Sequence, residues 1–185
     1  MAGKSVILLV PEIALTPQLL GLMAAHFGDR IAVLHSSLPE AERYDQWKRI
    51  HQGDARVVVG TRSAVFAPWE NPGVLILDEE QEQSYRSENS PRYCAKEVAL
   101  WRGLKENALV LLGSATPSIE TMFYAKSGIY KLCRLEHRWG GRSLPKVQIV
   151  DMREQLQLGN DDTVSYPLQD AIGHNIENKK QTILF

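Results

Sequence analysis

The sequence has few of the features that mark membrane, secreted or metal-binding proteins. It contains only two cysteines, Cys94 and Cys133, which lie far apart and have no CxxC partner, so neither a zinc site nor a disulfide framework is indicated. The apolar run Val6–Val10 is too short for a signal peptide or a membrane span. We therefore expect a cytoplasmic protein with free thiols, no membrane contact and no zinc ligands in these residues.

The chain also lacks an excess of charge of either sign. A net charge of −1 gives no basic surplus of the kind that indicates nucleic-acid binding, so any such contact must come from local groups. The 44% apolar and 23% charged residues, in a chain of 185, are typical of one globular domain, or of one domain and a piece of a second. Its five histidines are scattered without ligand spacing, so we assign none of them a catalytic role.

What the sequence does have is an alternation of short β-branched runs with amphipathic segments, which predicts βαβ units and a mostly parallel α/β sheet. Thr16-Pro17 predicts the start of a helix and Gly28 its end, and Gly53 is expected to end a second helix. That second helix carries four apolar residues on one face: Ala41, Tyr44, Trp47 and Ile50. The expected strands are Val6–Val10, Ile31–Leu34, Arg56–Gly60, Val74–Asp78 and Leu109–Gly113, and the later helices are Pro39–Gln52, Ala95–Lys105 and Ser118–Lys126.

The pattern is looser after Leu135. Trp139–Arg142 and Leu144-Pro145 predict a loop, and Gly159–Asp162 predicts a polar turn. We expect a strand at Lys146–Asp151, a helix at Tyr166–Asn178 and the beginning of another strand at Gln181–Phe185. Because a complete protein seldom ends on an apolar strand, we expect the chain to be a fragment.

Two of the predicted strands lead into segments whose side chains can bind ligands or take part in catalysis. The run Val74–Leu77 leads into Asp78-Glu79-Glu80-Gln81, and the run Leu109–Leu112 leads into Gly113-Ser114-Ala115-Thr116. Ligands of open α/β sheets bind at the carboxyl ends of the strands, so these acids and hydroxyls are placed to meet a nucleotide and its Mg²⁺. The residues alone also fit a solvated acidic strand end, with Ser114 or Thr116 capping the helix after Pro117.

Taken together, four segments resemble motifs Ia, Ib, II and III of the superfamily 2 helicases. They are Leu9–Gln18, Gly60–Pro68, Asp78–Gln81 and Gly113–Pro117. More narrowly, the chain resembles the PriA family of replication-restart helicases over essentially its whole length, with support from Val33–Ser36, Ser84–Tyr93 and Tyr130–Leu135. The resemblance implies a RecA-like first helicase lobe of the P-loop NTPase type, in which a parallel sheet is flanked by helices. Residues 1–138 would form this lobe without its P-loop strand, 139–180 a linker, and 181–185 the first strand of a second lobe.

The resemblance further implies ATP and Mg²⁺ as cofactors, and 3′–5′ helicase activity on single-stranded and forked DNA, with primosome and single-stranded DNA-binding proteins as partners. Asp78 would hold Mg²⁺ through water, and Glu79 would polarise the attacking water. Ser114 and Thr116 would belong to the nucleotide site and couple it to DNA. The residues implied in DNA contact are Thr61, Arg62, Ser63, Tyr85, Arg86, Arg92 and Tyr93, the last four as a stacking platform in a loop. An ordinary charged surface loop is the alternative for this group.

The sequence departs from the family pattern in two places. At position 81 this chain has Gln where PriA proteins have His, and the translocases Mfd and RecG also have Gln there. The difference leaves open how the acids communicate with the Ser114 segment. The phosphate-binding loop of the family would lie before residue 1. Gly3-Lys4-Ser5 is no substitute, because a strand rather than a helix follows it. We expect the isolated chain to be inactive, and the zinc ligands and arginine finger of the family to lie outside it. The alternatives are a Mfd- or RecG-like DNA translocase and a non-hydrolytic DNA- or protein-binding remnant.

Overall fold

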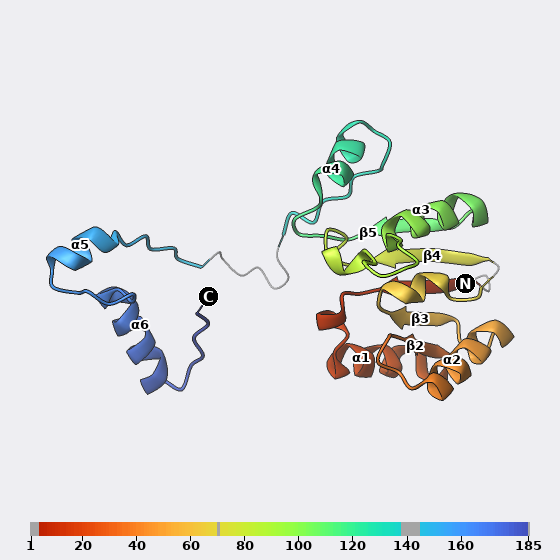
Figure 1. Ribbon diagram of the computed structural model, residues 1–185, viewed down its shortest axis with the longest axis horizontal. Coiled ribbons are helices and arrows are strands. Elements are labelled where there is room, and N and C mark those ends of the chain that lie inside the picture. The colour runs from red at the N-terminus through yellow and green to blue at the C-terminus, as the bar shows by residue number, and fades with distance from the viewer. Residues whose placement is uncertain (1–3, 70, 138–144, 185) are drawn as a thin grey trace. The chain divides into compact units, whose positions relative to one another are not determined.

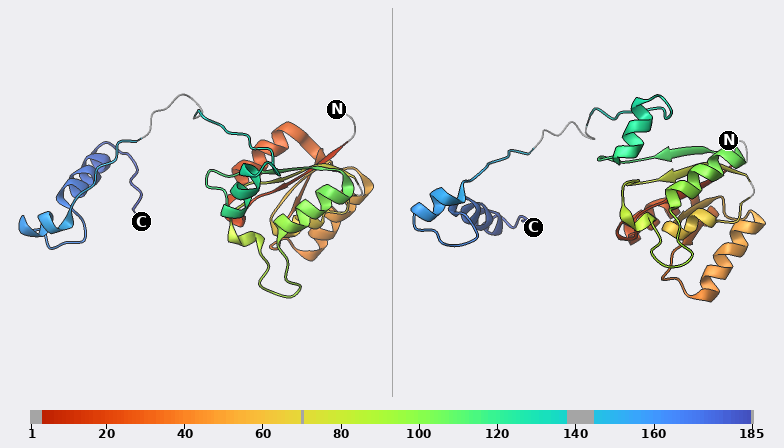
Figure 2. Two further views of the ribbon diagram at one scale, coloured as in Figure 1. Left: turned by 90° about the horizontal axis from the view of Figure 1, so that it is seen from above. Right: turned by 45° about the horizontal axis from the view of Figure 1, so that its top comes forward.

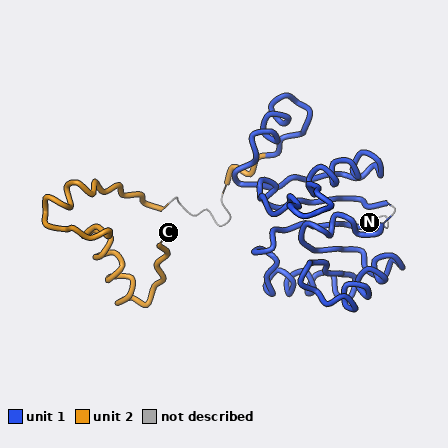
Figure 3. Tube along the Cα trace, in the orientation of Figure 1, with its two compact units in different colours: residues 1–133 blue, residues 134–185 orange. Residues whose placement is uncertain are grey.

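The structure is a computed structural model that describes residues 4–69, 71–137 and 145–184. The chain divides into two compact units, residues 1–133 and 134–185 (Figure 3). Among the described residues, no helix has the length and apolar character needed to cross a bilayer. The loop predicted at Trp139–Arg142 and Leu144 lies outside the described residues.

A parallel five-stranded sheet forms the first unit, with strand order β2-β3-β1-β4-β5 (Figure 1). All five predicted strands are present: β1 Ser5–Leu9, β2 Ile31–Leu34, β3 Val57–Gly60, β4 Pro72–Leu77 and β5 Leu109–Leu112. The register aligns their carboxyl ends, because Leu9 pairs with both Gly60 and Leu77, and Leu77 pairs with Leu112. The residues that follow these strands therefore meet at one edge of the sheet.

Four α-helices connect or follow these strands: α1 Pro17–Phe27, α2 Glu40–Gln52, α3 Ala95–Glu106 and α4 Ile119–Lys126. The predicted end signals are confirmed. The Thr16 hydroxyl accepts a hydrogen bond from the Leu19 N–H at 3.3 Å, and Gly53 ends α2 with a φ of +81°. Short 3₁₀ turns were not predicted, and they occur at Glu12–Ala14 (η1), Gly28–Arg30 (η2), Arg62–Phe66 (η3) and Gln83–Tyr85 (η4).

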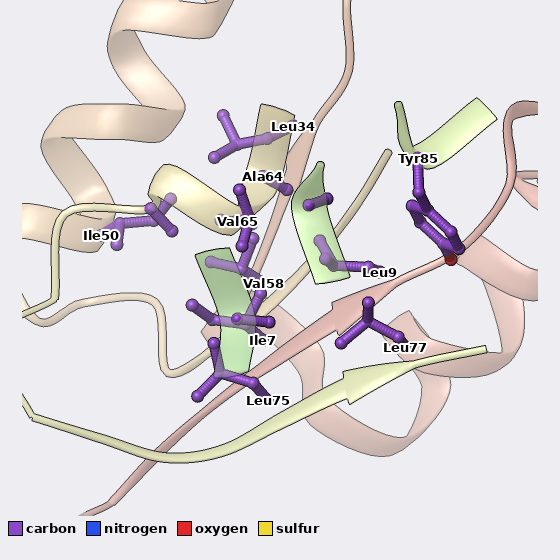
Figure 4. Packing of buried hydrophobic residues seen from close by; sticks show 14 of the residues in the cluster. Ile7, Leu9, Leu34, Ile50, Val58, Ala64, Val65, Leu75, Leu77 and Tyr85 are labelled. Carbon is purple, nitrogen blue, oxygen red and sulfur yellow. The ribbon is translucent and has the colours of Figure 1, made fainter. Parts of the chain in front are cut away.

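The core has two layers, because strand side chains alternate between the two faces of the sheet. Helices cover both faces (Figure 2). Ile7 and Leu9 point into the larger layer, with residues of α2, α3 and η3 (Figure 4). Leu8 packs on the other face with residues of α1. The expectation of a buried apolar face on α2 is correct only for Ile50. Tyr44 and Trp47 are 63% and 43% exposed and stack on the outside of the helix.

The second unit contains α5 Met152–Gln157 and α6 Tyr166–Glu177. The predicted helix at Tyr166–Asn178 is confirmed, whereas α5 was not predicted. The strand predicted at Lys146–Asp151 is wrong: residues 146–150 have no strand partner, and the Asp151 carboxylate instead caps α5 by accepting from the Arg153 N–H at 2.9 Å. Residues 181–184 likewise form no strand in the described part of the chain, where they have no neighbouring strand to pair with.

A candidate nucleotide site at the carboxyl edge of the sheet

The acid segment Asp78–Gln81 leaves β4 between two neighbouring strands. The Asp78 N–H donates to the Leu9 carbonyl at the end of β1, and the Glu80 N–H donates to the Gly113 carbonyl after β5, each at 3.0 Å. Between them, Glu79 has a φ of +49°, in the left-handed region that non-glycine residues seldom occupy. Backbone strain of this kind persists only where the surroundings impose it. The segment is therefore fixed on both sides, and its side chains leave in different directions.

A side-chain amide connects the acid segment to the hydroxyl segment. The Gln81 Nε2 atom donates to Glu79 Oε2 at 2.9 Å, and the Ser114 hydroxyl donates to Gln81 Oε1 at 2.6 Å. The same hydroxyl accepts from the Thr116 N–H at 2.9 Å. An amide has both a donor and an acceptor end, so glutamine can bridge a carboxylate and a hydroxyl. Hydrogen bonds of Gln81 thus connect Glu79 to Ser114.

The third acid, Glu80, has a different environment from Asp78 and Glu79. Its side chain is buried and accepts from Lys96 Nζ at 2.8 Å, the Ser118 N–H at 2.7 Å and the Thr121 hydroxyl at 3.0 Å. Burial raises the pKa of Glu80, but the hydrogen bonds from Lys96 and Ser118 lower it by more, so the pKa lies below its usual value. The sequence pattern groups Glu80 with the other acids and does not predict this separate environment. The available signal was Lys96, a cation in the first turn of a helix, where the dipole disfavours positive charge unless an anion is near.

Tyr85 belongs to the core, contrary to its predicted role as a stacking residue. Its side chain is 2% exposed and packs near Leu9 and Leu77 (Figure 4), and its hydroxyl donates to the Asp78 carbonyl at 2.7 Å. Burial, together with the negative charges of Asp78 and Glu79, raises the pKa of the Tyr85 hydroxyl well above its ordinary value, so it remains a donor. A buried ring has no face to offer a base. Its role is to support the backbone of the acid segment.

The predicted DNA-contact residues gather where η3 meets the loop 82–94. Arg62 Nη1 donates to the Ser84 carbonyl at 3.2 Å and also to the Arg86 carbonyl. The guanidinium lies 5.8 Å from the centre of the Tyr93 ring, which packs edge-on against Phe66 with centroids 4.9 Å apart. Phe66 is 53% exposed and was not predicted. In this structure Arg62 therefore holds the loop against η3.

The other predicted contacts divide by exposure. Ser63, Arg86 and Arg92 are exposed, as is Thr116 at the nucleotide edge. Thr61 is only 3% exposed, and its N–H donates to the Leu34 carbonyl at 3.1 Å. Its predicted contact with phosphate does not fit this burial, because Thr61 is used to close the turn after β3.

The residues at this edge fit a magnesium ion whose other ligands come from water and a nucleotide. Mg²⁺ is usually bound by one or two carboxylates together with waters and phosphate oxygens, and the exposed Asp78 offers such a carboxylate. No three His, Cys, Asp or Glu side chains within the described ranges gather closely enough to hold a metal alone. The strand predicted after Gly3-Lys4-Ser5 is confirmed, because β1 begins at Ser5.

Comparison with known proteins identifies the family. The family described as DEAD/DEAH box helicase matches residues 1–123. The chain belongs to the DEAD/DEAH box helicase family. The structure also resembles the C-terminal domain of Dbp5 from S. cerevisiae, with a TM-score of 0.50 and 12% identity over 73% of this chain and 75% of that one. At this identity the likeness supports the fold alone, which is RecA-like as predicted.

Curated relatives confirm the resemblance to PriA. The chain is 48% identical over 183 residues to the replication restart protein PriA of Bacillus subtilis, which covers 99% of this chain and 23% of that protein. It is 43% identical to PriA of Synechocystis, covering 99% of this chain and 23% of the relative. For PriA of Treponema pallidum the identity is 42%, with 99% and 27% covered. The chain thus spans about a quarter of the length of these relatives.

Proposed function

We propose that this chain is part of an ATP-dependent 3′–5′ DNA helicase that acts in replication-fork restart and primosome assembly. The observation that carries the proposal is the Gln81 bridge, which joins Glu79 to Ser114. It gives the family's acid and hydroxyl segments the physical connection that coupled hydrolysis requires. Residues 1–138 would form the partial first lobe, residues 139–180 a linker, and residues 181–185 the start of a second lobe.

In this proposal the chain orients groups around a bound nucleotide. Asp78 would hold Mg²⁺ through water, and the bound ion supplies neutralisation of phosphate charge. Glu79 would polarise the attacking water, with its carboxylate oriented by the Gln81 amide. Ser114 fixes that amide, so a displacement of the Ser114–Thr116 segment would reach Glu79 through Gln81.

The DNA would lie against η3 and the loop 82–94. Exposed Ser63, Arg86 and Arg92 offer a hydroxyl and two guanidinium groups to phosphates, contacts that fix position without reading sequence. Tyr93 and Phe66 supply aromatic surface beside them, which suits stacking of unpaired bases. The partners would be single-stranded and forked DNA, with primosome and single-stranded DNA-binding proteins.

The test uses a chimera in which this chain replaces the matched residues of Bacillus subtilis PriA. We expect ATP hydrolysis that rises when a single-stranded oligonucleotide is added. Glu79→Gln should abolish hydrolysis while ATP and DNA binding persist, because the water-orienting carboxylate is lost. Asp54→Asn, at an exposed acid that precedes the amino end of β3 and so lies away from the carboxyl edge, is the control and should keep its activity. A chimera that binds ATP and DNA without hydrolysis would instead support the non-hydrolytic remnant.

A further inference from the structure

The ion pair of buried Glu80 with half-buried Lys96 joins three elements of the proposed motor. Glu80 follows β4, Lys96 is in the first turn of α3, and Ser118 caps α4. Both Lys96 Nζ and the Ser118 hydroxyl contact Glu80 Oε2, at 2.8 and 3.2 Å. We propose that Glu80 and Lys96 are positioning residues that set the backbone of Glu79 and transmit the position of the loop 82–94 to it. This inference rests on the proposed function.

The contacts of Glu80 explain how it acts on its neighbour. Its backbone N–H is held by Gly113 and its carboxylate by α3 and α4, so the chain on the carboxyl side of Glu79 has one fixed course. On the other side, Asp78 is held by Leu9 and by the Tyr85 hydroxyl. A left-handed φ at a glutamate needs such restraint from both directions. Glu80 supplies one half of it.

A purely structural purpose explains this pair less well. A buried ion pair loses much of its Coulombic gain to desolvation, and a well-packed apolar pair of similar volume is often as stable. Lys96 is also placed unfavourably with respect to the dipole of α3. The ion pair instead fixes the orientation of the Glu80 carboxylate, because each oxygen has its own donors. Oε1 accepts from the Ser118 N–H, and Oε2 accepts from Lys96 and Thr121.

The loop 82–94 is joined to both members of this pair by the chain itself, because Glu80 lies two residues before it and Lys96 two residues after it. The two ends of this loop are held together by backbone contacts. The Ser87 N–H donates to the Tyr93 carbonyl at 2.8 Å, and Arg86 and Cys94 form an isolated antiparallel β-bridge. Lys96 follows two residues after Cys94, in the first turn of α3. A shift of the loop on contact with DNA would therefore move Lys96 relative to Glu80.

The test introduces Glu80→Gln and Lys96→Met separately into the chimera of this chain with Bacillus subtilis PriA. Each should lower the kcat of DNA-stimulated hydrolysis by at least about tenfold, a change equal to roughly 1.4 kcal/mol in the barrier. The KM for ATP and the DNA concentration at half-stimulation should stay near their original values, because neither residue is proposed to contact a ligand. Lys96→Arg, which keeps the charge, should recover most of the kcat. The double variant should be no slower than the slower single one, as expected of residues that act as a unit.

The matched control is Glu106→Gln, which breaks the other pair formed by α3. Arg102 and Glu106 are also largely buried, with Arg102 Nη2 3.0 Å from Glu106 Oε2, and Arg102 binds the carbonyls of Val65, Ala67 and Trp69 rather than the acid segment. It should lower the melting temperature without lowering kcat. An equal fall in kcat for Glu106→Gln, or an unchanged kcat for Glu80→Gln and Lys96→Met, would overturn the inference.

Failure of the proposed function would be visible separately. If the unsubstituted chimera does not hydrolyse ATP, the helicase assignment fails, and amide hydrogen exchange on the chain itself still decides the positioning role. Lys96→Met should then speed exchange of the Glu80 and Ser118 amides, which the network protects, and Glu106→Gln should leave them slow. Unchanged protection in Lys96→Met would contradict the inference.

Discussion

Single residues at the carboxyl edge of the sheet either face a possible ligand or support the residues that do. Asp78 is exposed and can meet a ligand, whereas Tyr85 is buried and supports Asp78 from beneath through its carbonyl. The sequence predicted the first correctly as a residue at a strand end, because a run of apolar residues fixes where a strand emerges. The burial of Tyr85 was not predicted, because the sequence around an aromatic residue in a polar loop does not indicate whether its side chain points into the core.

The support given by Tyr85 can be measured. Tyr85→Phe keeps the ring but removes the hydrogen bond to the Asp78 carbonyl, and we expect a loss of about 0.5–1.5 kcal/mol in unfolding free energy. Tyr85→Ala also empties the space of the ring and should cost about 3–5 kcal/mol, by analogy with other buried aromatics. Urea titration of the chain provides the measurement. Tyr44→Phe is the control, since Tyr44 is 63% exposed. Equal effects of Tyr85→Phe and Tyr44→Phe would contradict the assignment.

Elements were predictable where their signals are local. Thr16 and Gly53 mark helix ends by chemistry that acts within one turn, and β-branched runs mark the central strands. The strand expected at Lys146–Asp151 failed because a strand needs a partner, which the sequence of the segment does not reveal. The helix α5 was missed because so short a helix depends on its cap and its neighbours, here Asp151 and the Gln155 contact with the Tyr166 N–H at 2.8 Å.

The junction of β4, α3 and α4 should make stability depend on pH. The pKa of Glu80 is lower in the folded chain than its ordinary value of 4.5, so its stabilising effect is present above that pH and is lost as the pH falls below it. We therefore expect Glu80→Gln to destabilise the chain at pH 7 and to differ less from the original chain below about pH 4.5. Thermal unfolding of the two proteins at several pH values tests this. A difference that stays constant from pH 7 to pH 3 would show that the charge of Glu80 does not contribute.

At the scale of the whole molecule, the site depends on contacts between segments distant in sequence. Arg62 reaches the loop 82–94 from η3, and Gln81 reaches Ser114 from the end of the neighbouring strand. Motif order and strand register were enough to bring these segments to one edge. The individual pairings were not predictable, because they depend on side-chain directions that the packing of the lobe decides.

Packing also leaves one side of the sheet incomplete within the described residues. There β5 pairs only with β4, and two of its side chains, Leu109 and Leu111, are 63% and 46% exposed. An edge strand with exposed apolar side chains can pair with another copy. We therefore expect the isolated chain to self-associate at concentrations of about ten micromolar or above, a range in which exposed strand edges commonly aggregate.

The double variant Leu109→Lys and Leu111→Lys should weaken this association, because two charges on the exposed face of the edge strand oppose pairing. The fold should persist, since the packed side chains of β5, Val110 and Leu112, are unchanged. Sedimentation velocity over a concentration series, with circular dichroism to confirm folding, gives the measurement. Leu104→Lys is the control: Leu104 is 88% exposed on α3, so the variant removes apolar surface without altering the edge. If Leu104→Lys weakens association as much as the double variant does, general surface hydrophobicity drives it and the β5 edge has no special role.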